Sequence, residues 1–353
     1  MIRCRPGVPL LAMLILLASA PAVAQPASPP SDVSFNLKRS FLAWLMTGGT
    51  GGQPVGARWS VSLRMGAHSG VHGLEDDCEM HVAAKLPNNR VIAHPAGIVV
   101  EPPNVCERRV PQIRQTGRIR KAWTDWFDDN VEGKSCVATG FPRVFTEHSA
   151  GGEDDGSNPD HVVEIHPATA LSCGGVTLDF IRQIDVFPGM RRITDASTLA
   201  CLERRRLYVR QRGSGSSVRY EFLEEGAQGG HARCGNFAIV DAHIGKEYLR
   251  TLTNGGDHLA LAQAWIGESG PFPLKIYTYQ GTPEDDRIAG PLADPDETKN
   301  IALRLHGLLT YDYATIAGAL QDAHGAWLPS SALRDYKEIR NPLALVVFGE
   351  AVD

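Results

Sequence analysis

Six cysteines constrain the fold of this chain more than any other feature. They are spread over residues 78 to 234, and no two of them form a CxxC pair, which argues against a cysteine-ligated metal. An even number of cysteines in an oxidising compartment indicates disulfides, although six cysteines allow fifteen pairings. The six are Cys78, Cys106, Cys136, Cys173, Cys201 and Cys234.

The N-terminus predicts that the chain is exported. A basic start, MIRCR, is followed by the apolar run VPLLAMLILLASA and a small-residue ending, PAVA, which is the pattern of a secretory signal peptide. The apolar run is shorter than the roughly 20 residues that a membrane span needs. We expect residues 1–24 to be removed, together with the seventh cysteine, Cys4, and the mature protein to be periplasmic or secreted.

The spacing of the cysteines favours one set of disulfides. Cys136 and Cys173 are equally far from the centre of the Gly-rich stretch SAGGEDDGSNPD, so a hairpin centred there would place them opposite each other. A second hairpin around RGSGSS would pair Cys201 with Cys234, and Cys78 would then pair with Cys106. Each bridge would stabilise the fold by about 2–4 kcal/mol.

The pattern of apolar residues predicts a mainly β, β-rich α+β chain. Residues 25–56 form a leader with a short amphipathic helix, since apolar residues occur at positions 37, 41, 42 and 45. Several short strands, one helix and a hairpin in residues 57–175 predict an OB-like Greek-key barrel. Residues 176–353 predict a second β-rich domain with a C-terminal helix that begins after Asp312 and ends near Gly325. No internal repeat has a convincing period.

Residues 74–173 resemble a group of small, exported bacterial β-barrel proteins that are mainly uncharacterised. The resemblance rests on an acidic segment before a strand histidine, on VVEPPNVC leading into a helix with aromatic residues at its end, and on V-x-x-T-G-x-x-x-V-F followed by the strand motif V-E-I-H-P. It implies a barrel and export, and no activity. The matching residues are Glu75, Asp76, Asp77, His81, Trp126, Phe127, Val137, Thr139, Gly140, Val144, Phe145 and Val163 to Pro167.

A candidate polar site follows from strand parity in NPDHVVEIHPA. Side chains two residues apart share a face of a strand, so Glu164 and His166 should lie together while His161 points the other way. Asp77 and His81 share a face of their own strand by the same rule. If that strand lies next to the hairpin, all four side chains would lie close together.

Such a patch allows three interpretations. His81, Glu164 and His166 could bind zinc, whose nitrogen and oxygen ligands lie at about 2.0–2.2 Å. Neighbouring imidazoles and carboxylates could instead perform general acid–base chemistry. The third interpretation is structural, with Glu164 accepting hydrogen bonds from loop amides and His166 packed before Pro167.

Other motifs for catalysis or ion binding are weak. Ser69 in GAHSG lacks the G-x-S-x-G spacing of a nucleophile elbow. The sequence contains no P-loop, G-x-G-x-x-G or H-E-x-x-H motif. GGEDDGSNPD has the composition of a calcium loop without its regular spacing, so we expect a solvated turn. The oxygen-bearing residues of this turn are Glu153, Asp154, Asp155, Asn158 and Asp160.

The charge balance argues against a nucleic-acid or anionic-membrane partner. The chain has 35 basic and 40 acidic residues, and removing Arg3 and Arg5 with residues 1–24 changes the net charge from −5 to 33 − 40 = −7. The basic run ERRRLYVRQR could bind single strands, but the acidic residues of EFLEEG on the opposite arm predict cross-strand ion pairs instead. Those acidic residues are Glu221, Glu224 and Glu225.

Two functions are consistent with these observations. The first is an exported, disulfide-stabilised binding or structural module of the bacterial envelope, without catalytic activity and with an envelope ligand or protein as its partner. The second is a metal-assisted hydrolase, phosphodiesterase-like, that uses zinc or another divalent metal at Asp77, His81, Glu164 and His166. The sequence indicates no other cofactor.

Overall fold

The structure is a computed structural model, and it is mainly β, as predicted. Several predictions lie outside the described residues: the signal peptide, Asp77, the pair formed by Cys201 and Cys234, and the carboxylates at 153–155. Of the same acidic turn, Asn158 is buried and Asp160 is exposed. The structure describes residues 33–46, 58–72, 78–87, 97–103, 105–106, 110–113, 118–144, 156–184, 194–225, 237–252, 257–293 and 301–351.

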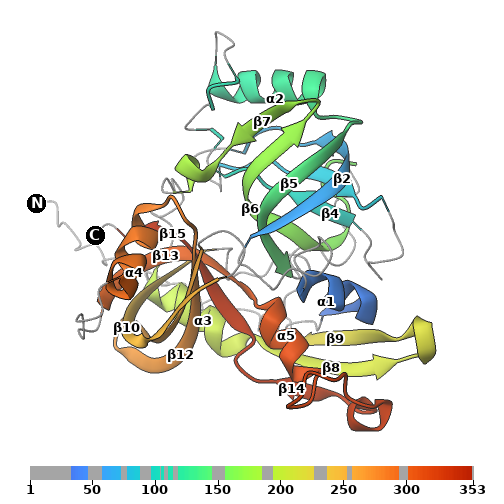
Figure 1. Ribbon diagram of the computed structural model, residues 1–353, viewed down its shortest axis with the longest axis vertical. Helices are drawn as coiled ribbons and strands as arrows, with labels where there is room; N and C mark the ends of the chain where they lie inside the picture. The colour runs from blue at the N-terminus through green and yellow to red at the C-terminus, as the bar shows by residue number, and fades with distance from the viewer. Residues whose placement is uncertain are drawn as a thin grey trace, which may run out of the picture.

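The first half of the chain forms a closed five-stranded barrel (Figure 1). Its pairing order is β2-β3-β4-β6-β5 and back to β2, and β4 and β6 run parallel while the other pairs are antiparallel. Helix α2 covers one end of the barrel, and β7 extends it beyond β6. The elements are β2 (Trp59–His68), β3 (Val82–Lys85), β4 (Gly97–Val100), α2 (Ile119–Asn130), β5 (Ser135–Val144), β6 (His161–Cys173) and β7 (Val176–Asp179).

Alternating side chains fill this barrel, and two disulfides close it. On β2, Trp59, Val61 and Leu63 are buried, while the intervening side chains are partly or fully exposed. Cys136 pairs with Cys173 across β5 and β6, and their Cα atoms are 4.5 Å apart. Cys78 pairs with Cys106, with 5.2 Å between the Cα atoms. Two of the three predicted bridges are therefore confirmed.

A second barrel repeats this topology with an unrelated pattern of residues. Its strands pair in the order β10-β11-β12-β15-β13 and back to β10. As in the first barrel, the third and fifth strands in chain order, here β12 and β15, are parallel. A helix again lies between the third and fourth strands. The elements are β10 (Phe237–Thr251), β11 (His258–Ile266), β12 (Ser269–Thr278), α4 (Pro283–Ala293), β13 (Ile301–Tyr311) and β15 (Leu343–Glu350).

Gly140 and Gly307 occupy corresponding places in the two barrels. A Cβ atom at Gly140 would overlap the carbonyl oxygen of Pro167, and one at Gly307 would overlap the carbonyl oxygen of Val346. In both barrels the close approach lies between the fourth and fifth strands, next to a register shift. The internal repeat that no sequence period reveals is therefore visible at these two residues.

A separate four-stranded sheet packs beside the barrels, with the order β1-β9-β8-β14. Helix α1 begins at Arg39 and buries Phe41, Leu42 and Leu45, as predicted, but Leu37 belongs to the strand before it. Asp312 caps helix α5, as predicted, although the helix ends at Ala319 rather than near Gly325. The elements are β1 (Val33–Lys38), α1 (Arg39–Met46), α3 (Asp195–Arg204), β8 (Arg206–Arg212), β9 (Arg219–Glu225), α5 (Tyr313–Ala319) and β14 (Lys337–Ile339).

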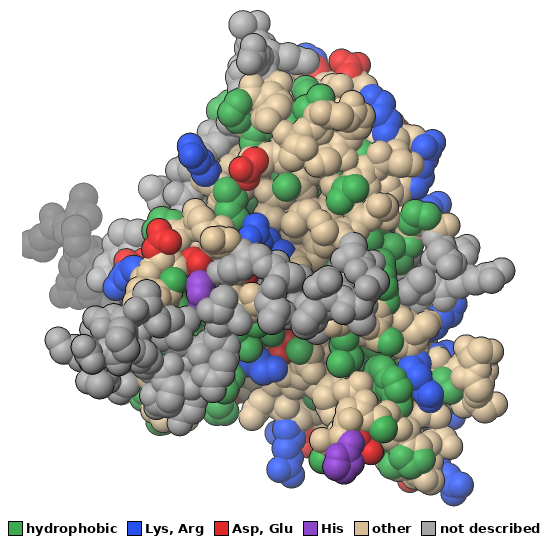
Figure 2. Space-filling model, viewed as in Figure 1, with side chains coloured by type: hydrophobic (Ala, Val, Ile, Leu, Met, Phe, Trp, Pro, Cys, Tyr) green, Lys and Arg blue, Asp and Glu red, His purple; other side chains and the backbone are tan. Residues whose placement is uncertain are grey.

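The arginine-rich hairpin of β8 and β9 contains the predicted cross-strand ion pairs. Arg210 and Arg212 each donate to Glu221, at 2.8 Å for the closest atoms, and together they hold the pKa of Glu221 at about 2. On the face drawn in Figure 2, basic and acidic side chains are interspersed and neither kind gathers into a continuous patch. Within the described ranges, none of the helices has the length and apolar character that crossing a membrane requires.

Candidate functional site

A group of seven charged or titratable side chains, here called the buried polar cluster, lies on one side of the first barrel. Three come from β6, one from β5, one from the residue after β4 and two from the segment before β3. All are at most 7% exposed. The members are Glu79, His81, Glu101, Arg143, His161, Glu164 and His166.

His161 joins the cluster because β6 is bulged at its start. His161 is paired with Gly97, but the next pair along the strands is Ile98 with Val163, so β6 has one extra residue. A bulge reverses the alternation of side chains at that point. The prediction that His161 lies on the face opposite Glu164 is therefore wrong: His161 Nε2 lies 3.1 Å from Glu164 Oε1.

The ring of His161 is held in one orientation. Its Nδ1 lies 2.6 Å from the carbonyl oxygen of Pro159 and donates to it, so Nε2 faces the carboxylate of Glu164. Burial acts to lower the pKa of His161, but the hydrogen bond and the charge of Glu164 outweigh burial and raise that pKa.

His166 lies between two carboxylates. Its Nδ1 is 2.6 Å from Glu101 Oε2, and its Nε2 is 2.8 Å from Glu79 Oε1. Burial acts to lower the pKa of His166, but the charges of Glu101 and Glu79 raise it well above its usual value. Each ring nitrogen of His166 thus faces a carboxylate oxygen, and Arg143 Nη1 also lies 3.0 Å from Nδ1.

Arg143 neutralises the third carboxylate. Its Nη1 donates to Glu164 Oε2 at 2.7 Å. Burial acts to raise the pKa of Glu164, but the charge of Arg143 and the hydrogen bonds of the two histidines hold it well below its usual range. The pKa of Glu101 is also lowered, because His166 outweighs burial. Three carboxylates thus face one guanidinium and two imidazole rings whose pKa values are raised, and buried charges require such pairing.

The cluster also lies against the second barrel. The ring of His166 is 6.5 Å, centre to centre, from both Phe237 of β10 and Phe348 of β15, in edge-to-face arrangements. Two aromatic rings of the second barrel thus pack against His166. This packing couples the charge pairs of the first barrel to the position of the second.

Three of the predicted site residues come together. His81 Nε2 lies 3.6 Å from Glu101 Oε1, and the same carboxylate contacts His166, which lies beside Glu164. The sequence interpretation did not include Glu101, Arg143 or His161. Glu79, two residues before His81, was not assigned to the site either, although it contacts His166 directly. Glu101 follows directly after the last residue of β4, so its place at the end of a strand was the signal that could have assigned it to the site.

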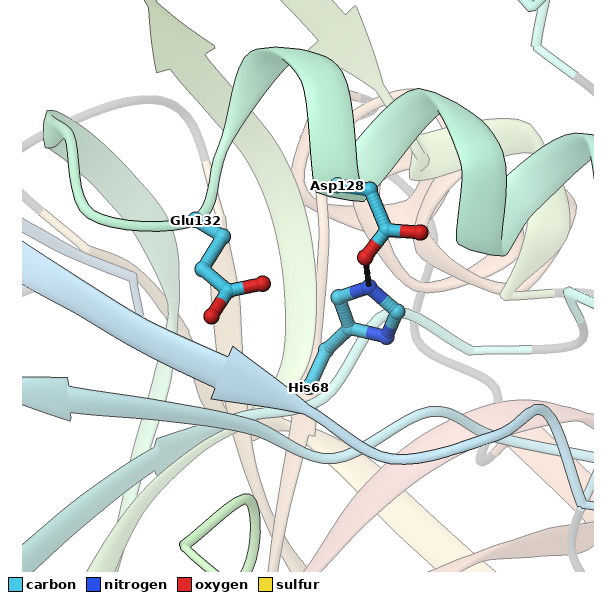
Figure 3. A group of neighbouring side chains, drawn as sticks. All are labelled: His68, Asp128 and Glu132. Atoms are coloured by element: carbon cyan, nitrogen blue, oxygen red, sulfur yellow. Dashed lines mark hydrogen bonds and ion pairs between the residues drawn. The ribbon is translucent and has the colours of Figure 1, made fainter.

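A second group of possible ligands is exposed at the open end of β2 (Figure 3). His68 Nε2 lies 2.9 Å from Asp128 Oδ1, and His68 Nδ1 donates to the carbonyl oxygen of Ser69 at 2.8 Å. Glu132, in the turn that follows helix α2, lies nearby without a drawn interaction. The Asp128 side chain is 60% exposed. Such a solvated pair contributes little to stability.

A groove, here called the sheet-face groove, crosses the outside of the second barrel. It has a volume of about 660 Å³ and runs over β10, β11 and β12 to the segment before β15. Among the residues that the structure describes, none that lines the groove is acidic, in a chain with a net charge of −5. The lining residues are His243, Gly245, Leu261, Ala262, Gln263, Pro273, Leu274, Lys275, Thr315, Arg340, Asn341 and Leu343.

The floor of the sheet-face groove offers apolar, amide and ring surfaces. Leu261 is 47% exposed, and Gln263 follows on the same face of β11. The ring of His243 lies 4.6 Å from that of Trp265, the next outward residue of β11. Lys275 Nζ donates to Asp312 Oδ2 at 2.5 Å and to Thr315 Oγ1 at 2.6 Å.

No protein-family model matches the chain, and neither the curated proteins nor the solved structures contain a significant match. Inference about function therefore rests on the geometry of the cluster and the groove.

Proposed function

We propose that the protein is an exported, non-catalytic binding module of the bacterial envelope whose ligand occupies the sheet-face groove. The observation that carries the proposal is the groove itself, an open surface on an acidic protein whose described lining residues include Lys275 and Arg340 and no carboxylate. The signal-peptide pattern of residues 1–24 and the two disulfides support export, since disulfides persist in oxidising compartments.

The two barrels are of the OB type in this proposal. Support comes from the shared strand order, from the parallel pairing of the third and fifth strands, and from the helix between the third and fourth strands. OB barrels bind oligosaccharides or oligonucleotides across their second and third strands. In the second barrel those strands are β11 and β12, which form the floor of the groove.

The ligand class that fits best is an acidic oligosaccharide. Arg340 is exposed at the groove, while Lys337 and Glu338 beside it carry opposite charges, so Arg340 is the group that favours an anion. Gln263 and Asn341 can bond hydroxyl groups, and the exposed side chain of Leu261 can pack against the apolar face of a sugar ring. The net charge of the chain disfavours a nucleic acid, which relies on an extended basic surface.

The hydrolase alternative has less support. Glu164 and His166 are 2% and 0% exposed, and each already contacts a partner of opposite charge. A substrate phosphate would have to displace Arg143 or an imidazolium to reach them. These residues therefore stabilise the fold in the proposal and do not act on a substrate.

Calorimetric titration tests the proposal. Tetragalacturonate should bind the disulfide-intact protein, and the neutral tetrasaccharide cellotetraose should bind at least about tenfold more weakly, because it lacks the charge that Arg340 recognises. Arg340→Gln should weaken tetragalacturonate binding about tenfold. The matched control is Arg64→Gln, which removes an exposed arginine from the outer face of β2 and should leave binding unchanged.

Three results would contradict the proposal. They are equal binding of the two saccharides, tighter binding of an octathymidylate, and an equal effect of the two arginine variants. Zinc-dependent hydrolysis of bis-p-nitrophenyl phosphate that Glu164→Gln abolishes would favour the hydrolase instead.

A further inference from the structure

One part of the buried polar cluster has the arrangement of a closed cation site. Glu101, His161 and Glu164 each offer one ligand atom, and these atoms all lie within 4.8 Å of one another. His161 Nε2 and Glu164 Oε1 are 3.1 Å apart. Two ligands that bind one zinc ion at 2.0–2.1 Å in a tetrahedral arrangement are separated by about 3.3 Å. The existing spacing thus needs little adjustment to accept an ion.

Each of the three side chains is also held by a partner outside the group. His161 donates through Nδ1 to the carbonyl oxygen of Pro159. Glu164 accepts from Arg143 on Oε2. Glu101 accepts from His166 on its own Oε2. Outer partners of this kind orient the ligands of metal sites and set which ring nitrogen of a histidine is available.

The donor set suits a divalent cation. Glu101 and Glu164 supply carboxylate oxygens, and His161 supplies a ring nitrogen, all of them buried. A divalent cation bound at this point would offset the charges of two buried carboxylates.

We propose that the buried polar cluster binds one divalent cation through Nε2 of His161 and the carboxylates of Glu101 and Glu164. An imidazole with two carboxylates suits zinc and, less tightly, manganese. The site is buried beneath the second barrel, so the ion would be structural. It would tie the bulged start of β6 to the end of β4.

This assignment differs from the metal set that strand parity predicts. His166 is retained as the group that orients Glu101, and it does not bind the ion. His81 is 3.6 Å from Glu101 and lies beside the site. His161, which parity places on the other face, becomes the nitrogen ligand. The inference is independent of the sheet-face groove.

Metal content is the direct test. The disulfide-intact protein, incubated with zinc chloride above room temperature so that the buried site can open, should retain about one zinc per chain after dialysis. Bound zinc should raise the melting temperature by at least about 3 °C, as a ligand specific to the folded state does. His161→Gln keeps a donor for the carbonyl of Pro159 but offers no ring nitrogen, and it should retain no zinc.

The exposed group of Figure 3 provides the matched control. His68→Gln removes the only imidazole of that group and should retain the zinc of the wild type. If His161→Gln retained its zinc, or if His68→Gln lost it, the assignment would be overturned. Absence of zinc in the wild type would do the same.

A spectroscopic measurement covers the case in which His161→Gln does not fold. X-ray absorption of the zinc-loaded wild-type protein should show one imidazole nitrogen near 2.0–2.1 Å, with oxygen as the remaining ligands. Two or more imidazoles, or any sulfur, would exclude the proposed set. Circular dichroism of each variant reports separately whether it is folded.

Discussion

His166 Nε2 lies 2.8 Å from Oε1 of Glu79, a residue 87 positions earlier in the chain, and both side chains are at most 1% exposed. Removing one partner of a buried ion pair leaves the other charge uncompensated, and this is much more destabilising than removing an exposed pair. Because the ring of His166 also contacts Phe237 and Phe348, the effect should reach the contact between the barrels.

Glu79→Gln should therefore lower the free energy of unfolding by about 3 kcal/mol. The measurement is urea denaturation followed by tryptophan fluorescence. Asp128→Asn is the control, because it removes the charge from the exposed pair with His68 and should change stability by at most about 1 kcal/mol. Equal losses in the two variants would show that burial does not decide the strength of these pairs.

The repeat of the barrel predicts parallel effects at two glycines. Gly140→Ala and Gly307→Ala each force a Cβ atom against a carbonyl oxygen of the neighbouring strand, so each should destabilise the protein by about 1–3 kcal/mol or more. Gly318→Ala is the control: Gly318 is an exposed residue of α5 with open space around the added Cβ, and the change should be neutral or stabilise by up to about 1 kcal/mol. A harmless Gly307→Ala would contradict the equivalence of the two glycines.

The disulfide between Cys136 and Cys173 closes a separation of 37 residues. In the chain-entropy model a loop of this length corresponds to about 4 kcal/mol, so the double substitution of both cysteines by alanine should lower the free energy of unfolding by roughly that amount. Thermal unfolding of the variant, compared with the wild type, measures the loss. A loss below about 1 kcal/mol would mean that the reduced unfolded chain is already restricted in this region.

The sequence predicted the features that depend on local patterns. The symmetry of Cys136 and Cys173 about a Gly-rich turn located one hairpin, and alternating residues located most strands. The position of His161 could not be predicted in this way, because a single inserted residue in β6 reverses the alternation and depends on how β4 pairs with β6. Glu101 and Arg143 reach the cluster through strand neighbours that are distant in sequence. The second barrel was not recognised as a repeat, because its corresponding strand, LALVVFGE, is apolar where β6 is charged.

Acid should destabilise the protein through His306 on β13. Burial lowers the pKa of His306 to about 4, while the unfolded chain has a value near 6.5. A depressed histidine pKa means that the unfolded state binds the proton more tightly, so the contribution is complete above pH 6.5 and is lost as the pH falls towards 4. A difference of about 2.5 units corresponds to about 3 kcal/mol.

The comparison of wild type with His306→Gln isolates this contribution from the other titrating groups. Free energies of unfolding should be measured by urea denaturation at several pH values between about 7.5 and 4. The stability of the wild type should fall more steeply than that of the variant below pH 6.5, and the two curves should run parallel above it. Parallel curves over the whole range would show that the pKa of His306 is the same in the folded and unfolded protein, although His306 is only 2% exposed in the folded one.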